Sequence, residues 1–254
     1  MSNFPVQHVL GIGQEKALST RKAAFLGQKA ETPDGRTFRY ALNGAVALAA
    51  GVTVQSPAQP ASSVYADALA YSTAIMGQTF ATGGTSITLT TGSTAIAANA
   101  FQDGYLYVKV VPGSGAYLIK ENTSGSSAGR VTVTVYAGDP FKDAFTTATR
   151  FALQQNPYSS VVVSAGGLTG AILGVAHSSV PIGNYFWLQT GGPAPTNMAA
   201  ATSAPGNRVI SGTTAGVAAG QTTAADQDVL PHIGHTFHIA ATADVIDLIK
   251  LEVD

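Results

Sequence analysis

Three histidines at intervals of three, between Pro231 and His238, are the residues whose type and spacing could bind a metal ion. His232, His235 and His238 would line one face of a helix, but Pro231, Gly234 and the β-forming residues between them indicate a strand or a turn. On a regular strand His232 and His238 share a face and His235 points away, whereas zinc needs three or four converging ligands. We therefore expect solvent-exposed or interfacial histidines, and we assign no metal ligand and no cofactor.

A second candidate for chemistry is the segment from Gly125 to Gly129, which matches the G-x-S-x-G pattern of serine hydrolases. A nucleophile elbow lies between a strand and a helix and needs a histidine and an acid nearby. Here the pattern lies between Asn122 and the valine-rich stretch that begins at Val131, which predicts a hairpin loop of small residues. We assign no catalytic residue and expect that the protein is not an enzyme. A hydrolase built from distant parts of the chain is the alternative, which the few carboxylates between residues 41 and 225 disfavour.

The composition narrows the possible partners. Charged residues make up 11% of the 254 residues and the formal net charge is −1, whereas roughly a quarter of an ordinary soluble domain is charged. Nucleic acid is a poor partner for such a chain, because phosphate contacts need a basic surface. The most apolar run, residues 41–54, is too short to cross a bilayer, and no stretch has the pattern of a signal peptide. The absence of cysteine excludes disulfides, thiol nucleophiles and iron–sulfur clusters.

Charge is also distributed unevenly along the chain. Residues 1–39 carry six basic and three acidic side chains, whereas residues 226–254 carry six acidic side chains and one lysine. Between these ends, Asp67 is the only charge from residue 41 to 102, and Arg208 is the only charge from residue 151 to 225. Such stretches are typical of a surface rich in Thr, Ser, Asn and Gln, or of a surface that meets another protein.

The first 31 residues have a different pattern from the rest. Gln14 to Gln28 is rich in helix-forming residues, which predicts a short helix near the N-terminus, although such a helix is marginal in isolation. We expect residues 1–31 to form an extended basic arm that becomes ordered on a partner; an ordinary packed N-terminal segment is the alternative. The side chains that a partner would cover are Phe4, Val6, Val9, Leu18, Arg21, Lys22, Phe25 and Leu26.

From Thr32 onward the sequence predicts β-structure. Arg130 to Tyr136 shows it most clearly, since three valines alternate with two threonines. Short segments of this kind, separated by Gly and Pro turns, predict an all-β protein made of β-sandwich or barrel domains with an N-terminal arm. The expected strands span residues 37–40, 86–90, 105–111, 116–120, 130–136, 160–164, 172–176, 185–190, 208–211, 235–240 and 245–253.

The domain boundaries follow from these segments and from one break. Asn156-Pro157 marks the break, because the residue before proline favours an extended turn. We predict an arm at residues 1–31, a first β domain at 32–157 and a second at 158–254. Pairing of residues 32–60 with the second domain, which would make the middle of the chain an insertion, stays open.

The run from Thr32 to Gly51, which opens T-P-D-G-R-T-F-R-Y and continues A-L-N-G-A-V-A-L-A-A-G, resembles the start of tailed-bacteriophage head decoration (capsid cement) proteins. Similar pieces follow in order up to the C-terminal region; they span residues 103–106, 156–158, 180–193 and 234–243. The resemblance implies a structural virion protein, made in the host cytoplasm, that binds the major capsid protein on the capsid exterior and stabilises the shell. It also implies a homo-oligomer, most often a trimer or a dimer. Another virion surface component, such as a head fibre or a tail-associated receptor- or glycan-binding protein, is the alternative.

Overall fold

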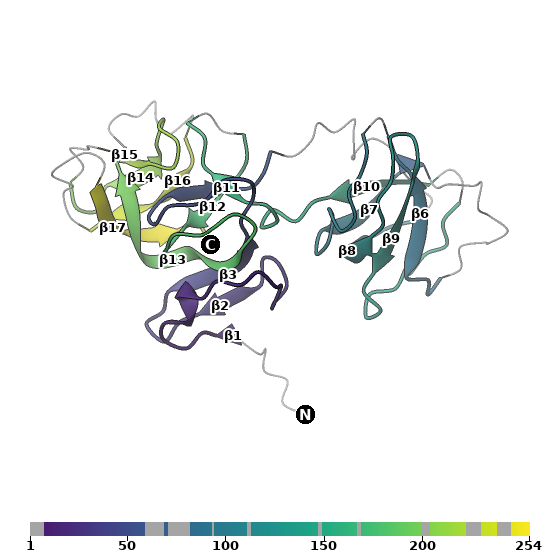
Figure 1. Cartoon of the computed structure of the whole chain (residues 1–254), viewed down its shortest axis with the longest axis horizontal. Coiled ribbons are helices and arrows are strands. Elements are labelled where there is room, and N and C mark those ends of the chain that lie inside the picture. Colours follow the sequence, from purple (N-terminus) through teal and green to yellow (C-terminus); the bar gives the residue numbers. More distant parts are fainter. Residues whose placement is uncertain are drawn as a thin grey trace. The chain divides into compact units, whose positions relative to one another are not determined.

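The protein is described by a computed structural model, and its elements are shown in Figure 1. The described residues are 8–58, 69–70, 82–92, 94–110, 113–146, 149–166, 169–199, 204–221, 230–237 and 245–254. They confirm the predicted all-β class: apart from one 3-10 turn, η1 (Gln14–Lys16), their regular structure is strand. Within the same residues, no helix has the length and apolar character that crossing a membrane requires.

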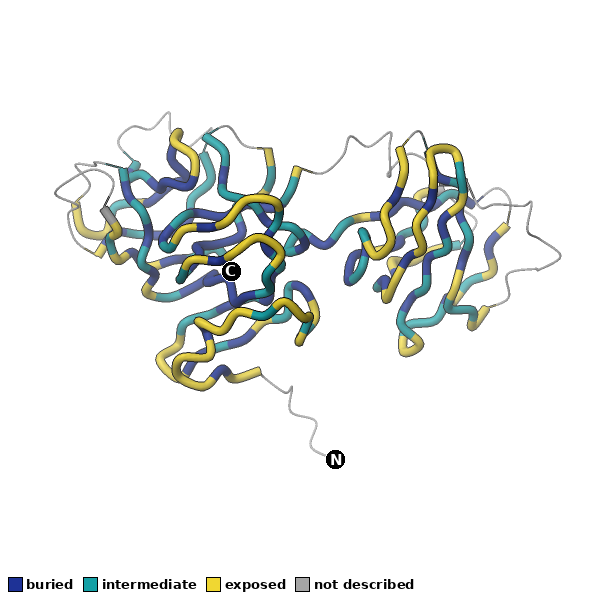
Figure 2. The backbone as a smooth tube through the Cα atoms, in the orientation of Figure 1, coloured by how far each residue is buried: buried dark blue, intermediate teal, exposed yellow. Residues whose placement is uncertain are grey.

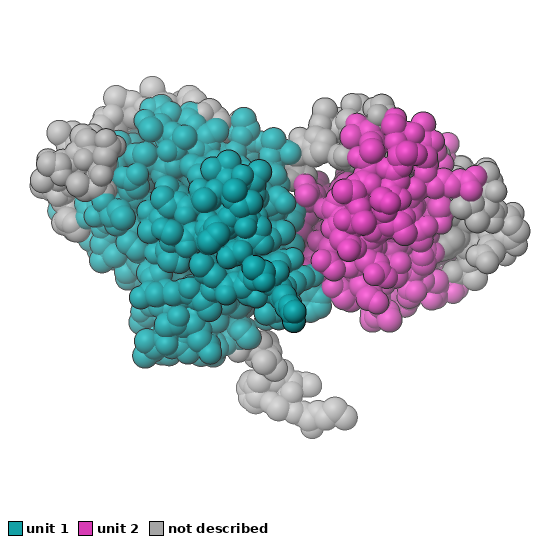
Figure 3. Space-filling view, viewed as in Figure 1, with its two compact units in different colours: residues 1–58, 157–254 teal, residues 59–156 magenta. Residues whose placement is uncertain are grey.

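The chain divides into two compact units, coloured separately in Figure 3. Unit 1 contains residues 1–58 and 157–254, and unit 2 contains residues 59–156. This corrects the predicted division at residues 32–157 and 158–254, although the break at Pro157 is where the second unit ends. The reason is a long-range pairing: Ala41 lies opposite Phe186 in neighbouring strands. Residues 32–58 therefore fold with the C-terminal part, and unit 2 is an insertion.

Unit 2 is a six-stranded antiparallel sheet. Its spatial order is β5-β10-β7-β8-β9-β6, and the two end strands β5 and β6 also lie in contact. The strands are β5 (Leu69–Ala70), β6 (Ser86–Thr90), β7 (Tyr105–Val110), β8 (Ala116–Asn122), β9 (Arg130–Val135) and β10 (Arg150–Gln154). The G-x-S-x-G segment is the loop between β8 and β9, as predicted.

The core of unit 2 follows from the alternation read in the sequence. Val131, Val133 and Val135 are buried, and the threonines between them are half-buried. The same alternation of buried and exposed residues appears in Figure 2. Phe141, Phe145 and their neighbours fill the space over the sheet with edge-to-face ring contacts, a favoured arrangement of aromatic pairs.

Unit 1 is built around β13 (Tyr185–Met198), a strand of fourteen residues. Its first half pairs with β3 and β12, and its second half pairs with β17 and ends beside β15. The remaining strands are β1 (His8–Val9), β2 (Lys29–Glu31), β3 (Thr37–Leu42), β4 (Thr53–Gln55), β11 (Val162–Val163), β12 (Ile172–Val175), β14 (Arg208–Ser211), β15 (Ala218–Gly220), β16 (His232–Thr236) and β17 (Val245–Glu252).

Part of this sheet closes on itself. The order β13-β15-β14-β16-β17 returns to β13 through the β13–β17 pairing, which makes a small barrel. The buried side chains of this part are aliphatic, and they fill the narrow interior that a barrel of few strands has. They include Met198, Val209, Ile233, Ile249 and Leu251.

The N-terminal segment differs from its prediction. The expected helix over residues 14–28 is reduced to η1: the cap residue Gly13 has a φ of 91° and Ala17 is already extended. Residues 8–31 are not an extended arm, because β2 pairs with β3 and β1 pairs with β2. The alternative of a packed N-terminal segment is therefore correct for these residues.

Unit 2 is expected to fold without unit 1, because the buried cluster at its centre comes entirely from residues 87–153. A chain of residues 59–156 should show a β-type circular dichroism spectrum and a single cooperative thermal transition. Dispersed amide proton signals would check the tertiary packing. A spectrum of unfolded chain under conditions where the full protein is folded would contradict this expectation.

Candidate functional site

The residues predicted to meet a partner lie on two sides of the N-terminal segment. Phe4 and Val6 fall outside the described residues. Leu26 points into the protein and is 8% exposed, whereas Phe25 beside it is 48% exposed. The same alternation holds at the start of the segment, where Val9 is exposed and Leu10 is buried.

Two inward leucines hold this segment on the sheet. Leu10 and Leu26 join a buried cluster with Phe38 and Tyr40 of β3 and Trp187 of β13. Full burial of a leucine contributes roughly 1.5–3 kcal/mol. Hydrogen bonds add to this: the N–H of Gly27 donates to the carbonyl oxygen of Tyr40 at 2.8 Å. The segment is therefore a fixed part of unit 1.

The outward side of the segment is apolar and basic. Val9, Ile12, Leu18 and Phe25 are all exposed, and Lys22 lies 5.8 Å above the Phe25 ring. We call these four side chains the outer apolar set. Ile12 is 90% exposed. It was not among the partner-binding residues predicted from the sequence, because it belongs to no periodic apolar pattern. Its position between Gly11 and Gly13 could have indicated an exposed turn.

A pocket of about 330 Å³ lies next to Ile12, and its other lining residues are Thr32, Pro33, Asp34 and Arg36. The polar groups of this pocket are already engaged with one another. Arg36 Nε lies 2.7 Å from an oxygen of Asp34, and Thr32 donates to the other oxygen of the same carboxylate. The pocket is therefore suited to holding an apolar group of a partner better than to activating a substrate.

An ion pair also holds the N-terminal segment on unit 1. Arg36 also approaches the buried Glu15 of η1, with Nη2 3.5 Å from Oε1. Burial raises the pKa of Glu15, but hydrogen bonds from backbone N–H groups and the charge of Arg36 outweigh this and hold it below its usual value. Burial, together with the positive charges of Arg36 and Lys16, lowers the pKa of His177. These shifts keep Glu15 ionised and His177 neutral at pH 7.

The basic start and the acidic end of the chain meet within one molecule. Arg39 contacts Asp254 through two parallel contacts, Nε to Oδ2 at 2.7 Å and Nη2 to Oδ1 at 2.8 Å. Burial raises the pKa of Asp254, and its hydrogen bonds with Arg39 more than offset this, so the net shift is downward. Part of the basic excess of residues 1–39 is thus neutralised internally, while Arg21 stays exposed.

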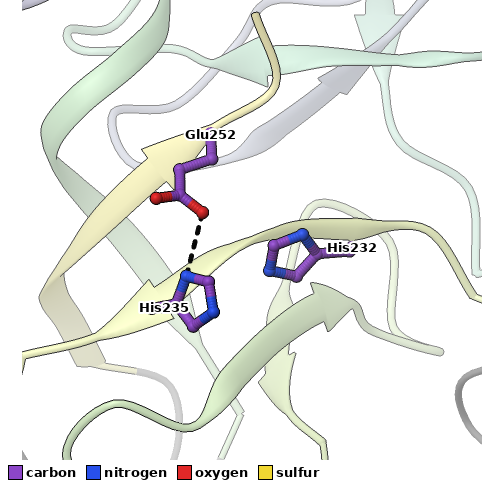
Figure 4. Close-up of side chains that lie close together, drawn as sticks. All are labelled: His232, His235 and Glu252. Carbon is purple, nitrogen blue, oxygen red and sulfur yellow. Dashed lines mark ion pairs between the residues drawn. The ribbon is translucent and has the colours of Figure 1, made fainter.

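The histidine motif has a geometry that the sequence did not predict. His232 and His235 lie with ring centroids 4.9 Å apart, and Figure 4 shows both rings beside Glu252. The prediction that His235 points away from His232 is wrong because β16 contains a bulge. Val209 pairs with Gly234 and the next residue, Ile210, pairs with His232, so Ile233 is the extra residue. One extra residue reverses the alternation of faces; His238 falls outside the described residues.

The third member of this group comes from the neighbouring strand. Glu252 of β17 has Oε2 2.9 Å from Nδ1 of His235 and Oε1 2.6 Å from Nζ of Lys250. The hydrogen bond from Lys250 is the main reason why the pKa of Glu252 lies below its usual value. His232 is held separately, with Nε2 2.7 Å from the carbonyl oxygen of Gly234.

The chain was also compared with known proteins. No family model, curated protein or solved structure matches it. Any functional inference therefore depends on the residues and their geometry, and on the motifs quoted from the sequence.

Adjacent residues on the two sides of the N-terminal segment should respond differently to truncation. Leu26→Ala is expected to lower the free energy of unfolding by about 2–3 kcal/mol, because it leaves a cavity in the cluster around Phe38 and Trp187. Phe25→Ala should change it much less, by about 0.5 kcal/mol, because that side chain is about half exposed and lies outside the buried cluster. Urea unfolding followed by Trp187 fluorescence measures both. Equal effects would show that the segment is not held as described.

Proposed function

We propose that this protein is a structural virion component that binds the outer surface of a phage capsid through the N-terminal segment of unit 1 and stabilises the shell. The observation that carries the proposal is the outer apolar set, held outward on a segment that Leu10 and Leu26 fasten from beneath. The choice of a phage capsid as the partner rests on the resemblance of residues 32–51 to capsid decoration proteins. Other features that support a structural role are the absence of cysteine and the low charge.

A fixed segment is better suited to this role than a loose arm. Ordering the backbone of a free arm would cost about 1–2 kcal/mol per residue on binding. Residues 8–31 are already ordered in the folded protein, so they lose little further backbone entropy on binding. Burial of Val9, Ile12 and Phe25 therefore contributes more directly to affinity. Repeated display on a capsid lattice multiplies modest single contacts.

Charge supports the same surface. Arg21 is exposed, and Lys22 lies beside Phe25 in the same segment. Both can face acidic groups on a capsid exterior. Attraction between exposed charges weakens as salt screens it, so binding should be weaker at high ionic strength.

The outer apolar set gives a direct test. The combined variant Val9→Ser, Ile12→Ser, Leu18→Ser and Phe25→Ser should bind undecorated capsids at least tenfold more weakly, since several exposed apolar contacts are lost together. Co-sedimentation with capsids measures the binding, and thermal unfolding verifies that the variant is folded.

A matched control uses exposed apolar residues elsewhere in unit 1. Ile246 and Leu248 of β17 are 56% and 44% exposed and lie outside both the N-terminal segment and the charge-poor stretches, so Ile246→Ser with Leu248→Ser should leave capsid binding unchanged. Wild-type affinity of the fourfold variant would contradict the proposed surface. Electron micrographs of particles that locate the protein on the tail would contradict the decoration role and favour a receptor- or glycan-binding component.

We also infer that the protein assembles as a homotrimer. The support is the long charge-poor stretches of residues 41–102 and 151–225, since interface cores are depleted in charge, together with the decoration-protein resemblance. Closed cyclic symmetry is the usual arrangement of repeated subunits.

Light scattering of the purified chain at micromolar concentration should therefore give three times the 25.8 kDa of one chain. A dilution series separates a stable trimer from a weak one. A monomer mass for the free protein and for protein released from particles would count against self-assembly, whatever the outcome of the capsid-binding test.

A further inference from the structure

We propose that His232, His235 and Glu252 bind one divalent transition-metal ion, zinc above all. One ligand atom from each of these side chains lies within 4.8 Å of the other two. Two imidazoles and one carboxylate from the protein, with a fourth position left for water, are a known ligand set for zinc. The site is separate from the surface proposed for capsid binding.

One distance between the ligand atoms already approaches that of a metal centre. In a tetrahedral zinc site with bonds of about 2.0–2.1 Å, neighbouring ligand atoms lie about 3.3 Å apart. Nδ1 of His235 and Oε2 of Glu252 are 2.9 Å apart, so they need to separate by only a few tenths of an ångström. The ion would replace the proton between them, and that proton would be released to solvent. His232 would bind through Nδ1, because its Nε2 is held by the carbonyl oxygen of Gly234, and its half-exposed side chain must shift to bring Nδ1 to the ion.

The backbone arranges these side chains before any ion arrives. The bulge at Ile233 brings His232 and His235 to the same face, and the β16–β17 pairing places Lys250 opposite His235, with Glu252 two residues further along β17. The carbonyl of Gly234 orients the His232 ring at 2.7 Å. Such outer contacts commonly fix metal-binding histidines.

Gly234 itself cannot be replaced without moving the strands. A Cβ atom at this position would lie 2.1 Å from the carbonyl oxygen of Lys250, far closer than van der Waals contact allows. The glycine between the two histidines is thus a requirement of the close approach of β16 and β17. It keeps the histidines at the distance from Glu252 that the site needs.

Nearby positive charge limits which ions can bind. Lys250 engages Oε1 of Glu252 and leaves Oε2 toward the histidines, while Arg208 lies opposite His235 on β14. A hard ion such as Mg²⁺ or Ca²⁺ prefers several oxygen ligands, and this site offers one carboxylate, which Lys250 already engages. Imidazole nitrogen favours Zn²⁺, Ni²⁺ and Cu²⁺ instead.

Binding would join β16 to β17, two strands of the closed barrel. A ligand that binds the folded chain and not the unfolded one stabilises the fold, so micromolar Zn²⁺ should raise the melting temperature of unit 1. The site is half-exposed, with side-chain exposures of 37% for His235 and 32% for Glu252, so an ion can enter from solvent without local opening.

The test uses the full chain without a histidine tag, freed of metal by dialysis against a chelator. Titration calorimetry with ZnCl₂ should give one ion per chain, and MgCl₂ should give no binding. Co²⁺ should produce the visible absorption of a four-coordinate ion. His235→Ala and Glu252→Gln should each weaken zinc binding about tenfold or more, whereas the control His8→Ala, which removes a ring stacked on Trp187, should not.

The melting temperature of each variant without metal shows that it is folded. Zinc binding of wild-type strength in His235→Ala would overturn the proposal, and so would a wild-type chain that takes up no stoichiometric zinc. Either result would leave the capsid-binding proposal unaffected, because the outer apolar set contains none of the three ligands.

Discussion

Unit 1 depends on one strand, β13, whose backbone hydrogen bonds are satisfied by different segments of the chain along its length. Its fourteen residues carry no charge, and Phe186, Leu188 and Met198 are buried. A buried strand without partners would leave unpaired amide and carbonyl groups at a cost of several kcal/mol. The N-terminal β3, the C-terminal β17 and the intervening β12 all pair with it, so segments far apart in sequence are held to one element.

The same constraint explains two prolines that would otherwise be out of place in a central strand. Asn197 donates its N–H to the carbonyl of Gly51 and not to β17. Alternate residues of a strand direct their N–H groups to the same edge, so residues 193 and 195 face the same edge as the N–H of Asn197, away from β17. Proline has no N–H group, and at Pro193 and Pro195 the missing donor would therefore lie on the edge where β13 has no continuous ladder of hydrogen bonds. The prolines therefore remove no hydrogen bond to β17.

Attachment of the N-terminal segment is a consequence of this arrangement. Trp187 of β13 and Phe38 of β3 leave an apolar surface that Leu10 and Leu26 cover. The residues directly before these leucines, Val9 and Phe25, are then directed outward. A basic, partly apolar segment becomes a rigid surface instead of a tether. Such rigidity would favour the capsid binding proposed above, since less entropy is lost with each contact.

The all-β class, the hairpin around the G-x-S-x-G loop and the strands β6, β9 and β14 could be predicted from the amino-acid sequence, because alternation of side chains is a local property. The sequence did not determine that residues 32–58 pair across an insertion, that residues 8–31 are packed, or that His232 and His235 share a face. Gly234 could have indicated a bulge between the two histidines, but the position of a bulge depends on the register of the neighbouring strands. Partners separated by more than a hundred residues, such as Tyr40 and Trp187, are chosen by burial of the whole sheet. This pairing is visible in the folded structure and not in any local sequence pattern, because the free energy that selects it comes from contacts between distant segments.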